Sequence, residues 1–581
     1  MFRALFRCLP GLSTIALLIL IGFAFFDLDS RLPLKAHVSH GSVHKHWKAE
    51  HGELKLSQKI FVLYFLITHI DTAGFSLRLC LALVLVRRKI KETLKRRQIP
   101  LPDAFEQDGS PLLKHRRGNS PPPPYTSAPP SPSLNELSPH SEVKHAIIIP
   151  NYSECLETLQ TTLKNLASHP RARTQYEIYL AMEKKEAGSE AKAATLISAF
   201  EDEFAEIRAT FHPSDIPGEI AGKSSNVSFA ARQIFRDHQE SADKLDVIIT
   251  VIDSDTHLLQ DYFTELRRLH HRHPNSSCAL YVCPIIFDRN AHETNVLVRV
   301  ADILWGAAGL SGFLPWSTIL IPTSVYSLPL ALAEQVGGWD GDPVAIGEDM
   351  HMLLKTYFNS HGKLATIPVY SAASQCNISA GECDEWSRGL RTIQARYRQA
   401  QRHMWGCLDS GYTARRIVEL KSFRLSHIPL LHLLWEAHIL PSHFILMLLT
   451  QLVYTSRTPT SKIHPELLWA FATCTTIRNA SFFVMQVALT LYDGYHHLCV
   501  TTRAQDMQVA GIEETFAWRQ PWKAKYLAER ILFPIAGAIY SAAPAIYAQV
   551  FHFWTDRLVY SVSLKPIRAL SGTSRSAEGL V

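Results

Sequence analysis

The chain has 581 residues, of which 47% are hydrophobic and only 19% are charged, a lower charged share than soluble domains carry. This balance predicts that part of the chain lies in lipid. The formal net charge of +6 fits the excess of Lys and Arg that membrane proteins keep on the cytosolic side, and it is too small to indicate a nucleic-acid partner. The ten cysteines include no CxxC pair, which argues against a zinc ribbon or a disulfide framework.

Residues 1–98 are predicted to hold two transmembrane helices. The first apolar stretch, residues 11–26, lacks a convincing signal cleavage site, and the second, residues 60–86, is long enough to span a bilayer. A cluster of Arg and Lys directly after the second stretch marks the cytosolic side of the membrane. Asp71 and Arg78 lie on one face of that helix, where they either pair with each other or face neighbouring helices.

A linker and a folded domain follow. Residues 99–142 are rich in Pro and Ser, which predicts a disordered linker because such a segment buries too little apolar surface to fold. Strands and helices alternate over residues 143–385, which predicts a cytosolic α/β domain on a parallel sheet. The helices expected there include one over residues 192–208 and one over residues 224–238.

The most informative stretch of this domain is the apolar run that begins at Val247 and ends in Asp253 and Asp255. Its β-branched residues predict a strand that is buried on both faces. Because side chains two apart point the same way in extended backbone, the two aspartates are placed to share one hard cation, Mg²⁺ or Mn²⁺. An Asp-rich turn or helix cap is the simpler interpretation of the same pattern.

The C-terminal part is predicted to return to the membrane. Residues 386–422 are dense in Arg, Gln and aromatic side chains, which favours amphipathic helices at the membrane surface. Residues 423–581 hold three apolar stretches, at 428–454, 467–492 and 531–554, each long enough to span. Five spans in all would put the basic tail on the far side, although its charge suits the cytosol. Two prolines in the last stretch leave open whether it is re-entrant.

Further motifs surround the aspartate pair in chain order. They are Pro150, Asn151, Tyr152 and Glu154 after the first strand, Glu183 after the second, Lys223 and Asn226 at a helix start, the pair Glu348 and Asp349, and Gln399, Arg402 and Trp405 before the C-terminal spans. With Asp253 and Asp255, this set resembles the family 2 glycosyltransferases. It looks most like their membrane-embedded branch, which includes cellulose, chitin and hyaluronan synthases and fungal family 2 glycosyltransferase-like proteins.

The resemblance implies a GT-A fold flanked by N- and C-terminal transmembrane helices. It implies inverting transfer of a sugar from a nucleotide-diphospho-sugar, expected to be a UDP-sugar, to a saccharide or lipid-linked acceptor. Asp253 and Asp255 would hold the cation on the diphosphate, and Asp349 would take the proton of the acceptor hydroxyl as general base. Residues 150–154 would wrap the nucleoside, and Lys223 would lie near the donor.

Two positions depart from the family pattern. Glu183 stands where the family has a nucleotide-binding aspartate, and a charged, solvated turn is the alternative there. Processive members carry Gln-x-x-Arg-Trp, whereas here His403 follows Arg402 and Trp405 comes two residues later. Arg402 is expected to clamp diphosphate and Trp405 to offer an indole face to the acceptor, although a helix on the membrane surface would use both residues too. Polymer synthesis and transfer of one or a few sugars both stay open.

Other classes of protein are weighed against this one. Gly222, Lys223 and Ser224 resemble the end of a P-loop, but Pro217 occupies a required glycine position and no apolar strand leads into the segment. A multi-span transporter or receptor explains the apolar stretches but not the carboxylates at strand ends. A catalytically inactive family member that serves as a membrane scaffold is the other alternative. The plasma membrane or an endomembrane is the expected location, with the lipid bilayer as a partner.

Overall fold

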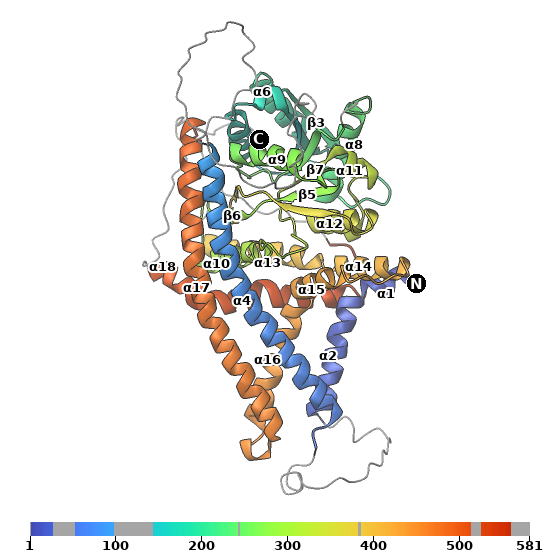
Figure 1. Cartoon of the computed structure of the whole chain (residues 1–581), viewed down its shortest axis with the longest axis vertical. Helices are drawn as coiled ribbons and strands as arrows, with labels where there is room; N and C mark the ends of the chain where they lie inside the picture. Colours follow the sequence, from blue (N-terminus) through green and yellow to red (C-terminus); the bar gives the residue numbers. More distant parts are fainter. Residues whose placement is uncertain are drawn as a thin grey trace, which may run out of the picture.

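The computed structural model of the chain describes residues 2–26, 53–97, 143–241, 244–380, 385–512 and 524–558. The predicted linker and the tail beyond residue 558 lie outside the described residues. Figure 1 shows an α/β domain at one end, long helices that extend away from it, and a layer of helices that lies crosswise between the two.

The α/β domain is built on a seven-stranded sheet with the strand order β3-β2-β1-β4-β7-β5-β8. Its strands are β1 (Lys144–Asn151), β2 (Tyr176–Glu183), β3 (Glu206–His212), β4 (Val247–Val251), β5 (Ala279–Val282), β7 (Tyr326–Pro329) and β8 (Ala365–Pro368). A second, two-stranded sheet pairs β6 (Ile285–Phe287) with β9 (Ala373–Gln375). The sheet is parallel from β3 to β4, as expected, but β7 runs antiparallel to both β4 and β5.

The expectation of a purely parallel sheet is therefore wrong. The strand that breaks it, β7, has four residues and ends at Pro329. A run this short carries too few positions for a periodic pattern, and its direction is set by its neighbours rather than by its own sequence. The strand β4, in contrast, is buried along its whole length, as its apolar run predicts.

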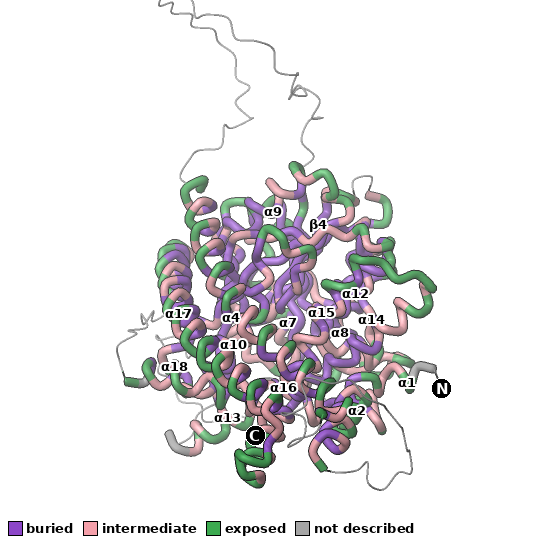
Figure 2. Tube along the Cα trace, turned by 60° about the horizontal axis from the view of Figure 1, so that its bottom comes forward, coloured by how far each residue is buried: buried purple, intermediate pink, exposed green. Residues whose placement is uncertain are grey.

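Helices cover both faces of the sheet. They are α5 (Leu156–Ala167), α6 (Ala172–Gln175), α7 (Ser189–Phe200), α8 (Lys223–Asp237), α9 (Gln260–Arg272), α10 (Val296–Leu310), α11 (Leu330–Gln335) and α12 (Glu348–Asn359). The core on one face includes residues of α5, α7 and α9, and the core on the other includes α8, α10 and α11. This second core continues into the long helices α4 (Leu56–Arg97) and α17 (Pro465–Val509), so the domain is packed directly onto them. Figure 2 shows that the buried residues lie mainly in the middle of the molecule.

The helix expected over residues 192–208 is wrong in its second half. The helix α7 ends at Phe200, and residues from Glu206 onward form β3, which pairs in parallel with β2. The sequence favours a helix because its apolar residues also fit the helical period. Pairing with the exposed edge of β2 satisfies the backbone of this segment instead, so tertiary context overrides local preference.

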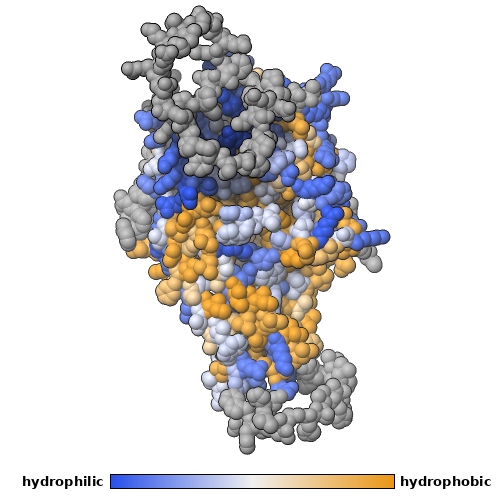
Figure 3. Space-filling model, in the orientation of Figure 1, coloured by the Kyte–Doolittle hydropathy of each residue, from blue (hydrophilic) through white to orange (hydrophobic). Residues whose placement is uncertain are grey.

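The remaining helices form the crosswise layer and the part remote from the sheet. They are α1 (Phe2–Arg7), α2 (Leu9–Phe25), α13 (Glu385–Trp405), α14 (Leu408–Glu419), α15 (His427–His438), α16 (Leu440–Arg457), α18 (Ala524–Gly537) and α19 (Ala543–Phe551), with a π-helical turn at Ala538–Ala542. Aromatic and aliphatic residues from α2, α4, α16 and α17 pack into one cluster far from the sheet. Figure 3 shows apolar surface gathered over this part of the molecule.

Two helices among the described residues are long and apolar enough to cross a membrane, Leu56–Arg97 and Tyr526–Phe551. A third appears if α15 and α16, which are bent by 57° at their junction, count as one span. The apolar helix α2 is shorter, with 17 residues. These helices indicate association with a membrane. Asp71 and Arg78 do not pair with each other, since Asp71 contacts His432 and Arg78 pairs with Glu436.

Candidate active site

A cavity of about 250 Å³ opens where the carboxyl ends of β1, β2 and β4 face α12 and α13. Every site residue that the sequence predicts, except Trp405, lines it. These residues are Pro150, Asn151, Tyr152, Glu154, Glu183, Lys223, Asn226, Asp253, Asp255, Glu348, Asp349, Gln399 and Arg402. Segments more than 200 residues apart in sequence thus meet at one site, at the edge of the sheet where α/β proteins bind their ligands.

The two aspartates after β4 hold different positions. Asp255 is buried, and its carboxylate accepts a hydrogen bond from the backbone N–H of Cys376 at 2.9 Å. Asp253 is about one-third exposed, and it accepts a hydrogen bond from the Gln375 side chain at 3.3 Å. Gln375 and Cys376, at the end of β9, position both carboxylates. Their oxygen atoms, facing one cavity, are the donor type that Mg²⁺ and Mn²⁺ prefer, so this pair fits a hard divalent cation.

Lys223, the first residue of α8, joins two carboxylates of the site. Its ammonium group lies 2.8 Å from Asp253 and 3.1 Å from Glu348. Burial lowers the pKa of Lys223, but Asp253 and then Glu348 raise it well above its ordinary value, so the side chain stays charged. Lys223 therefore neutralises carboxylates that would otherwise repel each other and any phosphate nearby.

Glu348 and Asp349 begin α12 but face different surroundings. Glu348 is buried, and it accepts a hydrogen bond from the hydroxyl of Tyr326. Burial raises the pKa of Glu348, Lys223 opposes this effect, and the neighbouring Asp349 adds to it. Asp349 is only half-buried, and its carboxylate accepts hydrogen bonds from the backbone N–H groups of Ser324 at 3.0 Å and Met350 at 2.8 Å. These bonds fix the Asp349 carboxylate at the cavity wall.

The carboxyl ends of β1 and β2 form another part of the cavity wall. The amide group of Asn226 donates to the backbone carbonyl of Ala181 at 2.7 Å, which ties α8 to β2. Glu183 is buried beside His212, whose Nδ1 lies 3.2 Å from it. Burial lowers the pKa of His212, but Glu183 and Glu219 raise it above its ordinary value. The alternative of a solvated turn at Glu183 is therefore wrong.

Trp405 does not line the cavity, and its expected role as an acceptor platform is contradicted. The indole is buried, packs edge-on against His552 at 4.5 Å, and donates to the backbone carbonyl of Asp556 at 3.0 Å. Residues two apart on a helix differ by roughly 200° in direction, so Trp405, the last residue of α13, points away from the cavity when His403 faces it. Its shifted spacing in the motif is thus the signal of a different role.

A different pair of aromatic rings lines the cavity. The rings of Trp305 and His403 stack with centroids 4.1 Å apart and an interplanar angle of 21°. Both residues line the cavity. Trp305 lies on α10, nearly 100 residues before the motif, and no pattern in the sequence connects it to His403.

Behind α12, a charged network holds the helix in place. His351 lies 2.6 Å from Asp409 through Nδ1 and 3.2 Å from Asp340 through Nε2. Burial lowers the pKa of His351, but Asp409 and Asp340 outweigh burial and raise it to about 9. The imidazolium thus anchors the helix that begins with Glu348 and Asp349.

Comparisons with known proteins agree in part with the sequence-based resemblance. Residues 248–485 match the model of the family described as glycosyl transferase family group 2. This match, which begins in β4 and extends into α17, supports a glycosyltransferase of family 2 and covers less than half of the chain. No curated protein matches.

Several solved structures are similar at low identity. One is the mannosyltransferase PcManGT from Pyrobaculum calidifontis in complex with GDP-Man and Mn²⁺, with 13% identity over 74% of this chain and 96% of that chain and a TM-score of 0.40. Another is S. aureus TarS 1-349, with 11% identity over 68% of this chain and 91% of that chain and a TM-score of 0.29.

Proposed function

We propose that this chain is a metal-dependent, inverting glycosyltransferase that acts at a membrane on a nucleotide-diphospho-sugar. The observation that carries the proposal is the convergence of Asp253, Asp255, Lys223 and Asp349 on one cavity, together with the family match over residues 248–485. A divalent cation held by Asp253 and Asp255 would neutralise charge on the diphosphate as it leaves.

The protein groups divide the chemical step between them. The acceptor oxygen attacks the anomeric carbon, the bond from that carbon to the diphosphate oxygen breaks, and the hydroxyl proton passes to the Asp349 carboxylate. Arg402 and Gln399 face the same cavity from α13, where a guanidinium offers paired donors to phosphate oxygens. The stacked rings of Trp305 and His403 offer a flat, partly apolar surface for a sugar acceptor.

The test is release of free nucleotide diphosphate by the full-length protein in detergent with lipid, using UDP- and GDP-sugars, with and without Mn²⁺ or Mg²⁺. Asp349→Asn should abolish turnover and keep donor binding, because the amide keeps the shape of the carboxylate but takes up no proton. Asp342→Asn, at an exposed carboxylate seven residues earlier, is the matched control and should retain turnover. Donor binding with no turnover in the wild type would favour an inactive scaffold. Absence of donor binding and release with every donor would sink the proposal.

The acceptor side of the cavity supports action at a membrane. Besides the polar residues, the cavity is lined by Ile321, Met350, Met404 and, from α15, Ala437 and His438. The helix α15 leads directly into the apolar helix α16. A lipid-linked acceptor would reach Asp349 from this side, whereas a soluble saccharide would not need the apolar lining.

The contacts of α18 and α19 argue against a crossing by Tyr526–Phe551, which leaves the four other apolar stretches of the sequence, at 11–26, 60–86, 428–454 and 467–492, as the candidate crossings. Arg299 of α10 pairs with Glu529 near the start of α18, and Asp556, just after α19, contacts Trp405 of α13. Both ends of this apolar segment thus lie on the side of the catalytic domain, and Figure 1 shows it crosswise beneath α10 and α13. An even number of crossings keeps the basic tail on the cytosolic side. A cysteine introduced after residue 570 tests this arrangement in sealed vesicles. Labelling of that cysteine only from the side opposite the catalytic domain would contradict it.

A further inference from the structure

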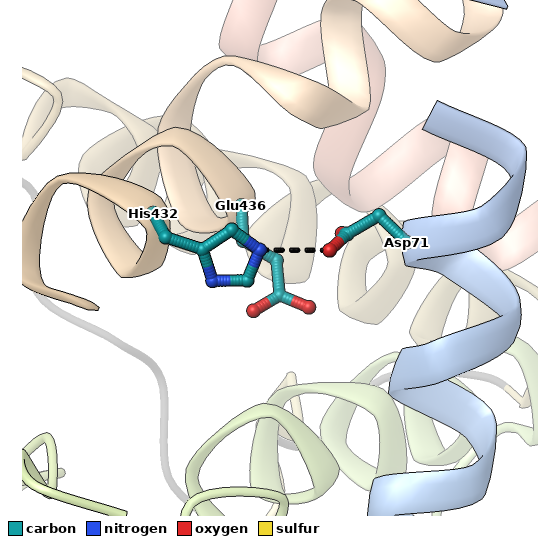
Figure 4. A group of neighbouring side chains, drawn as sticks. All are labelled: Asp71, His432 and Glu436. Atoms are coloured by element: carbon teal, nitrogen blue, oxygen red, sulfur yellow. Dashed lines mark hydrogen bonds and ion pairs between the residues drawn. The ribbon is translucent and has the colours of Figure 1, made fainter. Parts of the chain in front are cut away.

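A second group of titratable side chains lies apart from the catalytic cavity, between α4 and α15. His432 and Glu436 are four residues apart on α15, so they share one face of that helix, and Asp71 faces them from α4 (Figure 4). The Nε2 atom of His432 lies 2.8 Å from Oδ1 of Asp71. One nitrogen or oxygen atom from each of the three residues lies within 4.8 Å of the other two.

Two carboxylates and one guanidinium meet in this group, so its charges balance only when His432 carries a second proton. Arg78 pairs with Glu436 and offsets one carboxylate. Asp71 has only a neutral imidazole to accept from when His432 is uncharged, and its Oδ2 atom is buried with no hydrogen-bond partner among the described residues. The surroundings on α4 are apolar, with Ile67 and Ile70 exposed on the outer surface. A carboxylate in such surroundings favours a cation beside it.

We propose that Asp71, His432 and Glu436 bind a divalent transition-metal ion such as Zn²⁺. An imidazole nitrogen combined with carboxylate oxygens is a ligand set that binds Zn²⁺ and other divalent first-row transition metals, whereas Mg²⁺ and Ca²⁺ take oxygen ligands. Ligand atoms of a tetrahedral Zn²⁺ lie roughly 3.3 Å apart, as bonds of about 2.0–2.1 Å require. The His432–Asp71 contact therefore needs to widen by about half an ångström to admit the ion in place of the shared proton, and the Glu436 oxygen lies within 4.8 Å of both of these ligand atoms. His432 is 41% exposed, so its ring is not enclosed by the described residues.

The position of the site gives the ion a structural consequence. The residues that directly follow Glu436, Ala437 and His438, line the catalytic cavity. An ion that joins Asp71 to His432 and Glu436 fixes α15 to α4, and with it this wall of the cavity. The site differs in ligand chemistry and place from the Asp253 and Asp255 pair, and it does not depend on glycosyl transfer.

The test uses Co²⁺ as a visible probe in the full-length protein carrying Asp253→Asn and Asp255→Asn, which removes the other carboxylate pair. This protein should bind one equivalent of Co²⁺ with visible absorption typical of a four-coordinate site, and Zn²⁺ should displace it. His432→Gln and Asp71→Asn should each weaken binding by more than about tenfold. Arg78→Met should strengthen it, because Arg78 competes with the metal for Glu436. His271→Gln, which removes an exposed histidine on α9, is the matched control and should bind as before.

Thermal unfolding without metal shows whether each variant is folded, and Zn²⁺ should raise the midpoint of the protein with Asp71 but not of Asp71→Asn. The two ligand variants test the site independently, since an amide at position 71 can still hydrogen-bond to His432. The proposal would be overturned if the protein with intact Asp71, His432 and Glu436 bound no Co²⁺, or if His432→Gln and Asp71→Asn bound Co²⁺ as tightly as that protein does.

Discussion

Lys223→Met isolates the electrostatic balance of the candidate site. The substitution keeps an apolar chain of similar length and removes the charge that lies 3.1 Å from Glu348 and 2.8 Å from Asp253. Asp253 is about one-third exposed and stays solvated, so the cost falls mainly on Glu348, whose side chain is 2% exposed. We expect Glu348 to take up a proton in the folded variant rather than remain a buried, unpaired anion.

This uptake sets both the size and the pH dependence of the effect. Protonation of a glutamate with an ordinary pKa of about 4.3 costs about 1.36 kcal/mol per pH unit, so the loss of unfolding free energy is at most about 3.7 kcal/mol at pH 7 and about 1 kcal/mol at pH 5. The sign follows because the pKa of Glu348 is raised in the folded state. The folded variant binds one more proton than the unfolded chain, so the loss is absent below pH ~4 and grows as pH rises.

The assay is thermal unfolding of the purified full-length protein at pH 5 and pH 7. For a domain of this size, each kcal/mol shifts the midpoint by about 2–4 °C, so the variant should unfold up to about 7–15 °C below the wild type at pH 7 and about 2–4 °C below it at pH 5. Lys244→Met is the matched control, because Lys244 pairs with Glu334 at 2.9 Å with both side chains 27% exposed. It should cost at most about 1 kcal/mol and do so equally at both pH values. Equal destabilisation by Lys223→Met at both pH values would refute the charge-balance reasoning.

Two further predictions concern α12 and the aromatic pair. His351→Gln should destabilise the protein below pH ~6.5, where the folded and unfolded chains both carry the imidazolium. The difference in unfolding free energy from the wild type should disappear as pH rises through about 9, where wild-type His351 loses its charge. A pH-independent loss in unfolding experiments would contradict this. Trp305→Ala and His403→Ala should each raise the acceptor KM by about fivefold with donor binding unchanged. Trp405→Phe should lower the unfolding midpoint and leave the acceptor KM as it is. An effect on the acceptor KM confined to Trp405 would restore Trp405 as the acceptor platform.

The sequence predicts the polar residues of the site well because topology determines where they go. A buried apolar run with two aspartates at its end predicts a central strand, and β4 places Asp253 and Asp255 at the sheet edge accordingly. The same reasoning brings Lys223 to that edge, since it begins the helix that precedes β4. Such residues are tied to the ends of regular elements, whose positions the pattern of apolar residues reveals.

The parts that were missed depend on contacts between distant segments. The stacking of Trp305 on His403 and the support of the aspartates by Gln375 and Cys376 each join segments that share no local pattern. The antiparallel β7 has the same origin, because four residues take their direction from the strands on either side. A single sequence records what each segment prefers, but not which partner it meets.

The corrected role of Trp405 also bears on how the chain meets the membrane. As an acceptor platform, its indole would face the cavity and leave the end of the chain unconstrained. Its N–H instead holds the backbone of Asp556, and its ring packs on His552, so the segment after α19 stays beside α13. A last helix that crossed the bilayer would carry Asp556 to the opposite side, away from α13. The residue that departs from the processive motif is therefore the one that argues for the in-plane last helix proposed above.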